Sequence, residues 1–198
     1  MEPISLSPPR EERADAVRNR AHLIEVARLM VDELGVEKVT MDGLAERAGL
    51  GKGTVFRRFG TRAGIFHALF DREEQEFQQL LLSGSPPLGP GAPAVDRLVA
   101  YGRARVEFLV RHLALARAAI APGEPVPSGP SPSQFHVQML LREACPDIAE
   151  IGTLALQLTA ALEYPIVLHL RGPEGSSAFP VPEHLAETWE ILVDRLCR

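Results

Sequence analysis

The segment GLGKGTVFRRF, residues 49–59, combines residue types that bind phosphate groups. Its three glycines allow the backbone to approach an anion closely, and Lys52, Arg57 and Arg58 supply positive charge. The surrounding stretch 47–70 holds five Lys and Arg residues and no Asp or Glu, although the whole chain has a net charge of −5. Nucleotide phosphates and nucleic-acid phosphates both fit this chemistry. The first partner would indicate an enzyme and the second a DNA-binding protein.

A nucleotide site is disfavoured by the spacing of the glycines. A P-loop requires a glycine five residues before its Gly-Lys pair and a Ser or Thr directly after the lysine, but Glu46 and Gly53 occupy these positions. The dinucleotide pattern G-x-G-x-x-G fails because Thr54 stands at its third glycine. Both motifs also follow a β-strand, whereas helical periodicity precedes residue 49.

The segment lies at the end of a predicted three-helix unit. Apolar residues recur at helical spacing from Ala16 to Leu34, and Thr40 can cap a short second helix that ends at Gly49. A third helix is predicted over Lys52–Phe59, with Val55 and Phe59 facing inward. The small and basic residues of this helix would then face outward.

The remainder of the chain is also predicted to be helical. Thr61 can cap a fourth helix, and Pro- and Gly-rich stretches separate the helices that follow. Helical spacing of apolar residues predicts helices over 95–120, 133–144 and 147–170, and a last one carrying Leu185, Trp189, Leu192 and Leu196. Because no segment shows the alternation typical of strands, the predicted fold class is all-α.

The stretch TMDGLAERAGLGKGTVFRRFGTRAGIF, residues 40–66, resembles the DNA-binding domain of the TetR family of bacterial transcriptional regulators. The resemblance extends over residues 19–70. It implies an all-α homodimer with an N-terminal three-helix helix-turn-helix domain and a helical C-terminal ligand-binding and dimerisation domain. We place a flexible arm at 1–15, the helix-turn-helix domain at 16–62 and the C-terminal domain at 63–198.

A helix-turn-helix inserts its second helix into the major groove of DNA. By the resemblance, the residues expected to contact bases are Lys52, Gly53, Thr54 and Arg57, and those expected to contact phosphates are Thr40, Arg58 and Arg62. Phe56 replaces the family's usual tyrosine and is expected to contact a sugar or a thymine methyl group. Gly51 stands where the family usually has a serine, which predicts weaker capping of the recognition helix.

The C-terminal part contains polar residues among apolar ones, which are candidates for an inducer pocket. The polar candidates are Tyr101, Arg105, His136, Glu163 and Tyr164. The candidates for the apolar walls of such a pocket are Phe108, Phe135 and Met139. Apolar residues of the last two helices are candidates for a dimer interface, namely Leu156, Leu185, Trp189, Leu192 and Leu196. For both sets the alternative is that the side chains form the core of one protomer.

The sequence predicts no catalytic residues, no cofactor and no metal site. Cys145 and Cys197 are the only cysteines and are expected to be reduced thiols in a cytoplasmic protein. The apolar stretch 151–170 contains Gln157, Glu163 and Pro165, so it is predicted to be a buried helix and not a membrane span.

Together with the resemblance, these features predict a cytoplasmic, DNA-binding transcriptional regulator. It would act as a repressor that an unknown small molecule releases from a roughly palindromic operator. Two alternatives remain open at this point: a helical protein-interaction module with a vestigial DNA-binding unit, and a nucleotide-binding enzyme.

Overall fold

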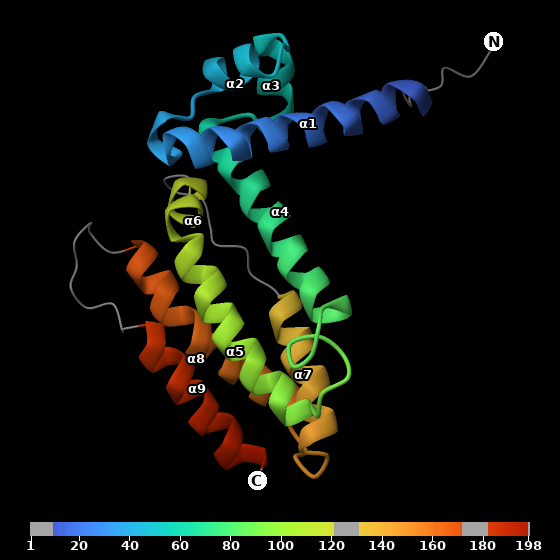
Figure 1. Cartoon of the computed structure of the whole chain (residues 1–198), viewed down its shortest axis with the longest axis vertical. Helices are drawn as coiled ribbons and strands as arrows, with labels where there is room; N and C mark the ends of the chain where they lie inside the picture. The colour runs from blue at the N-terminus through green and yellow to red at the C-terminus, as the bar shows by residue number, and fades with distance from the viewer. Residues whose placement is uncertain (1–9, 121–130, 172–181, 198) are drawn as a thin grey trace, which may run out of the picture. The chain divides into compact units, whose positions relative to one another are not determined.

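The computed structural model describes residues 10–120, 131–171 and 182–197 (Figure 1). These residues form helices and contain no strand, which confirms the all-α fold class. The helices are α1 (Arg10–Leu34), η1 (Val36–Lys38, a 3-10 turn), α2 (Met41–Arg47), α3 (Lys52–Phe59), α4 (Arg62–Ser83), α5 (Ala94–Arg111), α6 (Leu113–Ala119), α7 (Pro132–Ala144), α8 (Ile151–Arg171) and α9 (Pro182–Cys197). No helix within the described ranges combines the length and apolarity that crossing a bilayer requires.

The described residues form two compact units. The first contains residues up to 71 together with 118–120, and the second contains 72–117 and the described residues from 131 onward. The division therefore falls inside α4, whereas the boundary expected from the sequence lay at residue 62. Because α1 begins at Arg10, residues 10–15 of the expected arm are helical, whereas residues 1–9 lie outside the described part.

Local hydrogen bonds explain where the short helices of the first unit begin. The Thr40 side chain accepts a hydrogen bond of 3.0 Å from the backbone N–H of Gly43 at the start of α2. The Thr61 side chain accepts one of 3.1 Å from the N–H of Gly64 at the start of α4. Both contacts satisfy helix N–H groups that have no partner within the helix, and they confirm the two predicted caps.

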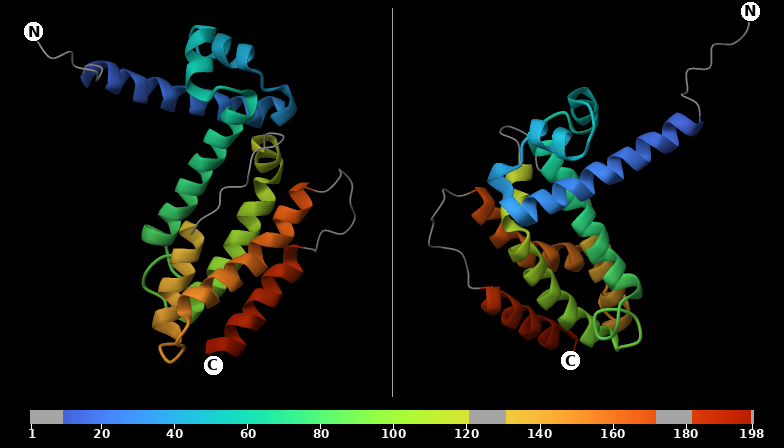
Figure 2. Two further views of the ribbon diagram at one scale, coloured as in Figure 1. Left: turned by 180° about the vertical axis from the view of Figure 1, so that it is seen from behind. Right: turned by 45° about the horizontal axis from the view of Figure 1, so that its top comes forward.

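In the second unit, α5 packs against α7, α8 and α9 (Figures 1 and 2). Trp189 of α9 is buried against α5 and donates a hydrogen bond of 2.7 Å from its indole N–H to the carbonyl oxygen of Leu98. Its ring lies where the side chain of Gly102 would be, because a Cβ built on Gly102 would stand 2.0 Å from the Cδ1 atom of Trp189. The glycine thus permits the close contact between α5 and α9.

Two helix boundaries differ from the prediction. The expected single helix 95–120 is interrupted at His112, whose ring packs against Phe108 with 4.6 Å between the ring centres. The expected helix 147–170 begins only at Ile151, after a turn that follows Cys145 and Pro146. The residue before a proline is disfavoured in the helical conformation, which explains why α7 ends before this turn.

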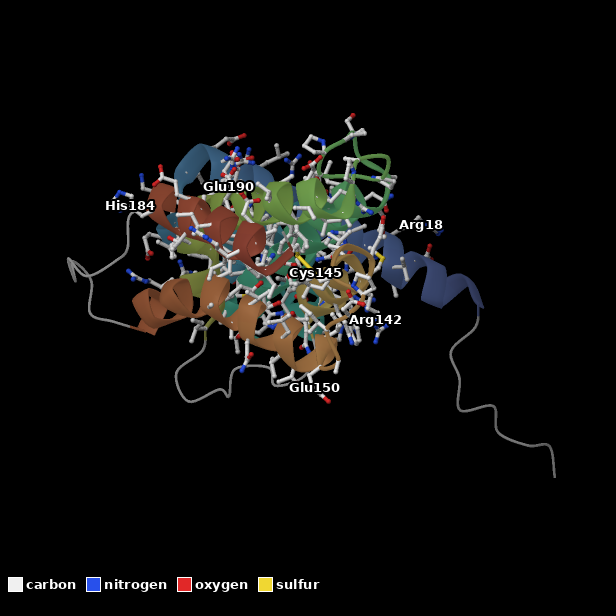
Figure 3. The ribbon with its side chains drawn as sticks, turned by 90° about the horizontal axis from the view of Figure 1, so that it is seen from below. Arg18, Arg142, Cys145, Glu150, His184 and Glu190 are labelled. Carbon is white, nitrogen blue, oxygen red and sulfur yellow. A yellow bond between two sulfur atoms is a disulfide. The ribbon has the colours of Figure 1, made fainter. Side chains whose placement is uncertain are left out.

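Cys145, which follows α7, and Cys197, at the end of α9, form a disulfide bond (Figure 3). Their Cα atoms are 5.5 Å apart although 52 residues separate them in the sequence. The expectation of two reduced thiols was therefore wrong. It rested on the small number of cysteines, which carries no information about whether two distant helix ends meet.

Candidate functional site

The candidate nucleic-acid interface consists of α2, the turn after it and α3. Gly49 lies in this turn with φ = 65°, a conformation that residues with a Cβ atom adopt at a cost. The N–H of Leu50 donates a hydrogen bond of 3.0 Å to the carbonyl oxygen of Ala45, which closes the end of α2. Val55 and Phe59, one helical turn apart, are both buried and fix the inward face of α3, as predicted.

The opposite face of α3 is open to solvent and carries the cations. Lys52, Gly53, Arg57 and Arg58 are exposed, and Thr54 is half-buried. The helix contains no acidic residue, so this face presents only positive charge. The arrangement fits the major groove of DNA, where the first residues of a recognition helix contact base edges and basic side chains bind phosphates.

Existing contacts on this face are weak enough to be exchanged for DNA. The Nζ atom of Lys52 lies 2.8 Å from an Oδ atom of Asp42, but both side chains are more than 60% exposed. An exposed ion pair of this kind contributes at most about 1 kcal/mol. Arg57 makes a long contact of 3.5 Å with the Thr54 hydroxyl oxygen on the same helix. The cations are therefore held near α3 but remain available.

Phe56 is an apolar side chain on this basic surface, and 52% of it is exposed. It extends from the same helix as the exposed cations and does not join the core. Its position agrees with the expected contact to a sugar or a thymine methyl group. At the start of α3, Gly51 has no side chain with which to cap the helix.

Arg62 differs from its expected role as a phosphate contact. Its Nε and Nη2 atoms donate hydrogen bonds of 2.8 and 2.7 Å to the carbonyl oxygens of Val39 and Val36. Its guanidinium also lies 4.7 Å from the centre of the Phe66 ring. Because two of its donor groups bind backbone oxygens of the segment before α2, Arg62 holds this segment against α4. We therefore assign it a positioning role, whereas Thr40 remains exposed at the start of α2.

The candidate pocket residues divide into buried and exposed ones. Tyr101, Arg105, Phe108 and His136 are buried, and Glu163 is half-buried. In contrast, Phe135 is 59% exposed and Met139 is 46% exposed, so neither side chain lies in the interior of the second unit. They share the outward face of α7, while His136 and Leu140, each one residue further along, face inward. The side chain of Tyr164 lies outside the described part.

Arg105 binds two carboxylates in the interior of the second unit. Its Nη1 atom lies 2.6 and 2.9 Å from the two carboxylate oxygens of Glu74, and its Nε atom lies 2.8 Å from one of Glu163. The guanidinium also lies 5.5 Å from the centre of the Phe77 ring and 5.1 Å from that of Phe108, within range of cation–π attraction. Burial opposes its charge, but the carboxylates outweigh this and raise the pKa of Arg105 above its usual value.

Glu74 and Phe77 were not predicted as members of this cluster. They belong to the charged stretch REEQEF, residues 72–77, which has the composition of a solvated helix face. Glu163 carried the clearest signal, because a lone carboxylate within an apolar stretch requires a partner.

Further polar atoms are buried near this cluster without a hydrogen bond to any described residue. They are Arg97 Nε, the Tyr101 hydroxyl, Ser133 Oγ, His136 Nε2 and Thr159 Oγ1. An unpaired buried polar group costs about 1–3 kcal/mol, so a set of them is unusual in a protein core. Burial also raises the pKa of Tyr101 and lowers the pKa of His136 to about 4, so both side chains are uncharged at neutral pH.

The low pKa of His136 predicts a loss of stability in acid. The pKa is about 4 in the folded state against 6.5 for an unperturbed histidine, so the unfolded state binds more protons between these values. The contribution of uncharged His136 to the free energy of unfolding is therefore fully present above pH 6.5, and it is lost as the pH falls from 6.5 toward 4. We expect it to lower the free energy of unfolding by about 2 kcal/mol between pH 7 and pH 5. Urea unfolding at both pH values should show a correspondingly smaller decrease for His136→Gln, and an equal decrease would contradict the assignment.

The candidate dimer residues also divide into two groups. Leu156 on α8 and Leu192 on α9 are 53% and 44% exposed, and neighbouring Ile191 is 59% exposed. Leu185 and Leu196 are half-buried. Trp189 is only 2% exposed and belongs to the core of one protomer, so it does not lie on a surface that a second copy would reach. The sequence correctly predicted that Leu185, Trp189, Leu192 and Leu196 recur at helical spacing. Trp189, however, faces α5 of the same protomer.

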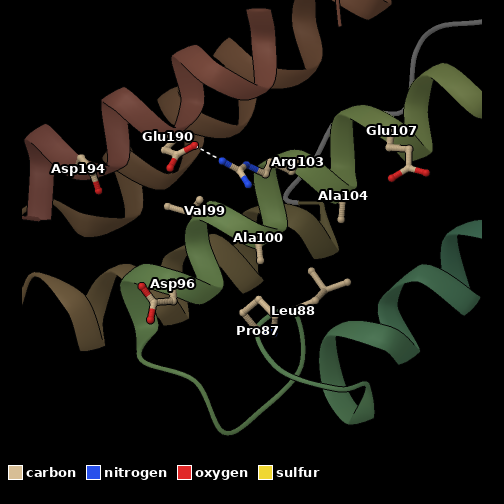
Figure 4. Close-up of a pocket in the computed structure, with 10 residues that line it drawn as sticks. All are labelled: Pro87, Leu88, Asp96, Val99, Ala100, Arg103, Ala104, Glu107, Glu190 and Asp194. Atoms are coloured by element: carbon tan, nitrogen blue, oxygen red, sulfur yellow. Dashed lines mark hydrogen bonds and ion pairs between the residues drawn. The ribbon is translucent and has the colours of Figure 1, made fainter. Parts of the chain in front are cut away.

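An open surface cavity of about 620 Å³ lies between α5, α9 and the segment that precedes α5 (Figure 4). Arg103 forms an ion pair with Glu190 across it. Asp96, Glu107 and Asp194 add further negative charge. None of the predicted pocket residues lines this cavity. Those on α5, namely Tyr101, Arg105 and Phe108, are buried on the interior side of that helix.

Comparisons with known proteins agree with the geometry of the first unit. Residues 23–69 match the model of the bacterial regulatory proteins of the tetR family. An HTH-type transcriptional regulator of Staphylococcus aureus strain bovine RF122 / ET3-1 is 34% identical over 65 residues, which are 33% of this chain and 35% of that protein. A second such regulator, from strain USA300, is 34% identical over 61 residues, or 31% and 33% of the two chains. The match thus spans about a third of the length of these curated relatives.

Two solved structures share the fold over most of both chains. A TetR-family transcriptional regulator from Pectobacterium atrosepticum has a TM-score of 0.67 at 20% identity, covering 93% of this chain and 97% of that chain. A TetR transcriptional regulator from Rhodococcus sp. RHA1 has a TM-score of 0.55 at 21% identity, covering 96% and 100%. The family match includes the whole of α2 and α3, which form the candidate interface, and we conclude that residues 23–69 form a DNA-binding domain of the type found in the bacterial regulatory proteins of the tetR family.

Proposed function

We propose that the chain is a sequence-specific DNA-binding repressor that acts as a homodimer in the bacterial cytoplasm and leaves its operator when a small molecule binds. The observation that carries the proposal is the outward face of α3, which presents Lys52, Arg57 and Arg58 without any acidic residue. A protein that binds phosphate groups along a groove requires such a face. The family match over α2 and α3 supports the same function.

Two further observations support a dimer and a ligand. Exposed leucine and isoleucine side chains on α8 and α9, among them Leu156, Ile191 and Leu192, require a cover that a second copy would supply. A two-fold dimer presents two copies of α3 and therefore predicts a roughly palindromic site. Polar atoms buried without partners in the second unit support a ligand site there. A ligand would shift the protein toward a form with low DNA affinity through its different affinities for the two forms.

Selection of bound duplexes from a random DNA pool tests the proposal. We expect enrichment of one palindromic motif, and we expect the protein to bind it as a dimer. If no sequence is enriched and the protein binds another protein instead, the chain is a helical interaction module and the proposal is wrong.

Substitutions in α3 separate contacts to bases from contacts to phosphates. Lys52→Ala should relax preference at particular base pairs of the selected site, at a cost of about 1–3 kcal/mol in discrimination. Arg58→Ala should weaken binding to all duplexes alike and reduce the slope of log K against log salt by about one. Fluorescence anisotropy with selected and mismatched duplexes at several salt concentrations measures both effects. A uniform loss for Lys52→Ala would contradict its assignment to bases.

A further inference from the structure

The interior of the second unit contains a cluster of polar side chains that do not satisfy one another. Tyr101 on α5 and His136 on α7 have ring centres 5.5 Å apart. Ser133, one turn before His136, is near enough to Tyr101 to lower its pKa, but the two hydroxyls do not form a hydrogen bond of acceptable geometry. Arg97, one turn before Tyr101 on α5, acts on the charge of His136. These side chains therefore lie in one region between α5 and α7.

Thr159 extends this region to α8. It lies one helical turn before Glu163, as Tyr101 lies one turn before Arg105, and the contact between Arg105 and Glu163 joins the two helices. Figure 1 shows that α5 and α8 run in the same direction. We therefore infer that Tyr101 and Thr159, each one turn before its partner in the Arg105–Glu163 contact, lie on the same side of this ion pair. Tyr101, Ser133, His136 and Thr159 each have at most 6% of their surface exposed. We call these four side chains together with Arg97 Nε the interior polar cluster.

The charges around the interior polar cluster balance. Arg97 and Arg105 contribute two positive charges, and Glu74 and Glu163 contribute two negative ones. Tyr101 and His136 are uncharged at neutral pH, because burial opposes charge on both. A ligand that brought a net charge of either sign would add an uncompensated charge to a largely buried site, which is costly. The balance therefore favours an uncharged ligand.

Hydrogen-bond chemistry defines the ligand further. The Arg97 N–H is a donor, and the hydroxyl groups of Tyr101, Ser133 and Thr159 are able to donate. Such a set is satisfied by a carbonyl or hydroxyl oxygen that accepts several hydrogen bonds. The neighbouring side chains include Phe77, Phe108 and Trp189, which suit an apolar body.

We propose that the interior polar cluster binds the oxygen of an uncharged, largely apolar small molecule and discriminates against its anionic and cationic counterparts. This inference rests on the proposed function, whose ligand it assigns to a chemical class. Because the polar atoms of the cluster are closed to solvent, a ligand reaches them only when α5, α7 and α8 separate. Binding is thus coupled to a change in helix packing, which a ligand-controlled regulator requires.

Trp189 provides a direct measure of binding. It is the only tryptophan of the chain, and its ring centre lies 6.0 Å from that of Tyr101. We would titrate the full chain, without DNA, with four probes of similar length: 2-octanone, 1-octanol, octanoate and octylammonium. The expected result is a saturable change in Trp189 fluorescence with 2-octanone or 1-octanol, and affinity at least tenfold lower for both charged probes. Failure of both uncharged probes to bind, or equal or tighter binding of a charged one, would overturn the proposal.

Two conservative variants test the residues themselves. Tyr101→Phe and Thr159→Val each remove a buried hydroxyl, and we expect each to weaken binding of the uncharged probe at least fivefold. The matched control is Thr153→Val, an exposed position on the same helix, which should bind as the unchanged protein does. Because the removed hydroxyls have no partner, thermal unfolding without ligand should occur at the same or a higher temperature. Unchanged affinity in both variants would show that the cluster does not bind the probe.

The outcome is separable from that of the proposed function. Probe binding without selection of any DNA site would contradict the proposed regulator but support this ligand class. Selection of a DNA site without binding of any uncharged probe would support the regulator and overturn this inference.

Discussion

Arg105→Met is expected to lower the free energy of unfolding at pH 7 by about 3 kcal/mol, because it leaves two largely buried carboxylates without their counter-ion. The guanidinium is 7% exposed and contacts both Glu74 and Glu163. Methionine preserves much of the apolar stem that lies near Phe77 and Phe108, so the loss reports mainly on charge. Urea unfolding followed by circular dichroism measures this difference.

Arg103→Met is the matched control, since it removes the same charge from the same helix. Arg103 is 60% exposed and pairs with Glu190 at the surface, so its loss should cost less than about 1 kcal/mol. The deficit of Arg105→Met should also shrink when Glu74→Gln and Glu163→Gln are added, because neutral amides require no counter-ion. Equal effects of the two arginine substitutions would contradict the role of Arg105 as counter-ion of Glu74 and Glu163. The same conclusion would follow if the two amide substitutions did not restore stability to Arg105→Met.

Gly102→Ala is expected to destabilise the protein by about 3 kcal/mol, although alanine is the better helix former. The new Cβ atom would lie 2.0 Å from Cδ1 and 2.2 Å from Nε1 of Trp189. The ring cannot simply withdraw, because its N–H is bonded to the carbonyl oxygen of Leu98 on the same helix as Gly102. We therefore expect α9 to shift away from α5, and both a lower midpoint in urea and red-shifted Trp189 fluorescence.

Gly53→Ala provides the comparison for this effect, because it makes the same change within another helix. A Cβ at Gly53 would meet no atom within 4 Å, so only helix propensity should change. We expect Gly53→Ala to stabilise the first unit by up to about 1 kcal/mol. Destabilisation by Gly53→Ala, or stabilisation by Gly102→Ala, would show that the contact with Trp189 does not decide the outcome.

Features that depend on local sequence could be predicted. The bounds of α3 were correct because Gly51 and Gly60 flank a short stretch with two buried residues one turn apart. The caps at Thr40 and Thr61 were correct because a side chain three residues before a free N–H reaches it whatever lies elsewhere. The exposure of Lys52, Arg57 and Arg58 could also be predicted, because Val55 and Phe59 define the inward face of α3 and the cations lie on its other sides.

Features that depend on distant contacts could not be predicted. Arg105 meets Glu74 across 31 residues and Glu163 across 58, and no local pattern specifies those distances. Arg62 is basic and lies near α3, so its type suggested a phosphate contact. Two of its donor groups instead bind the carbonyl oxygens of Val36 and Val39, which precede it by more than twenty residues. The exposure of Phe135 and Met139 could not be predicted, because α7 also carries Val137, Leu140 and Leu141, and apolar residues on several sides leave the inward face undetermined.

Our claim that α3 recognises DNA sequence can be checked in a single titration. The selected duplex and a scrambled duplex of equal length and composition would be titrated with the protein at physiological salt, with fluorescence anisotropy as the signal. We expect the selected duplex to bind at least about a thousandfold more tightly, as specific regulators do. Equal affinity for the two duplexes would contradict the claim.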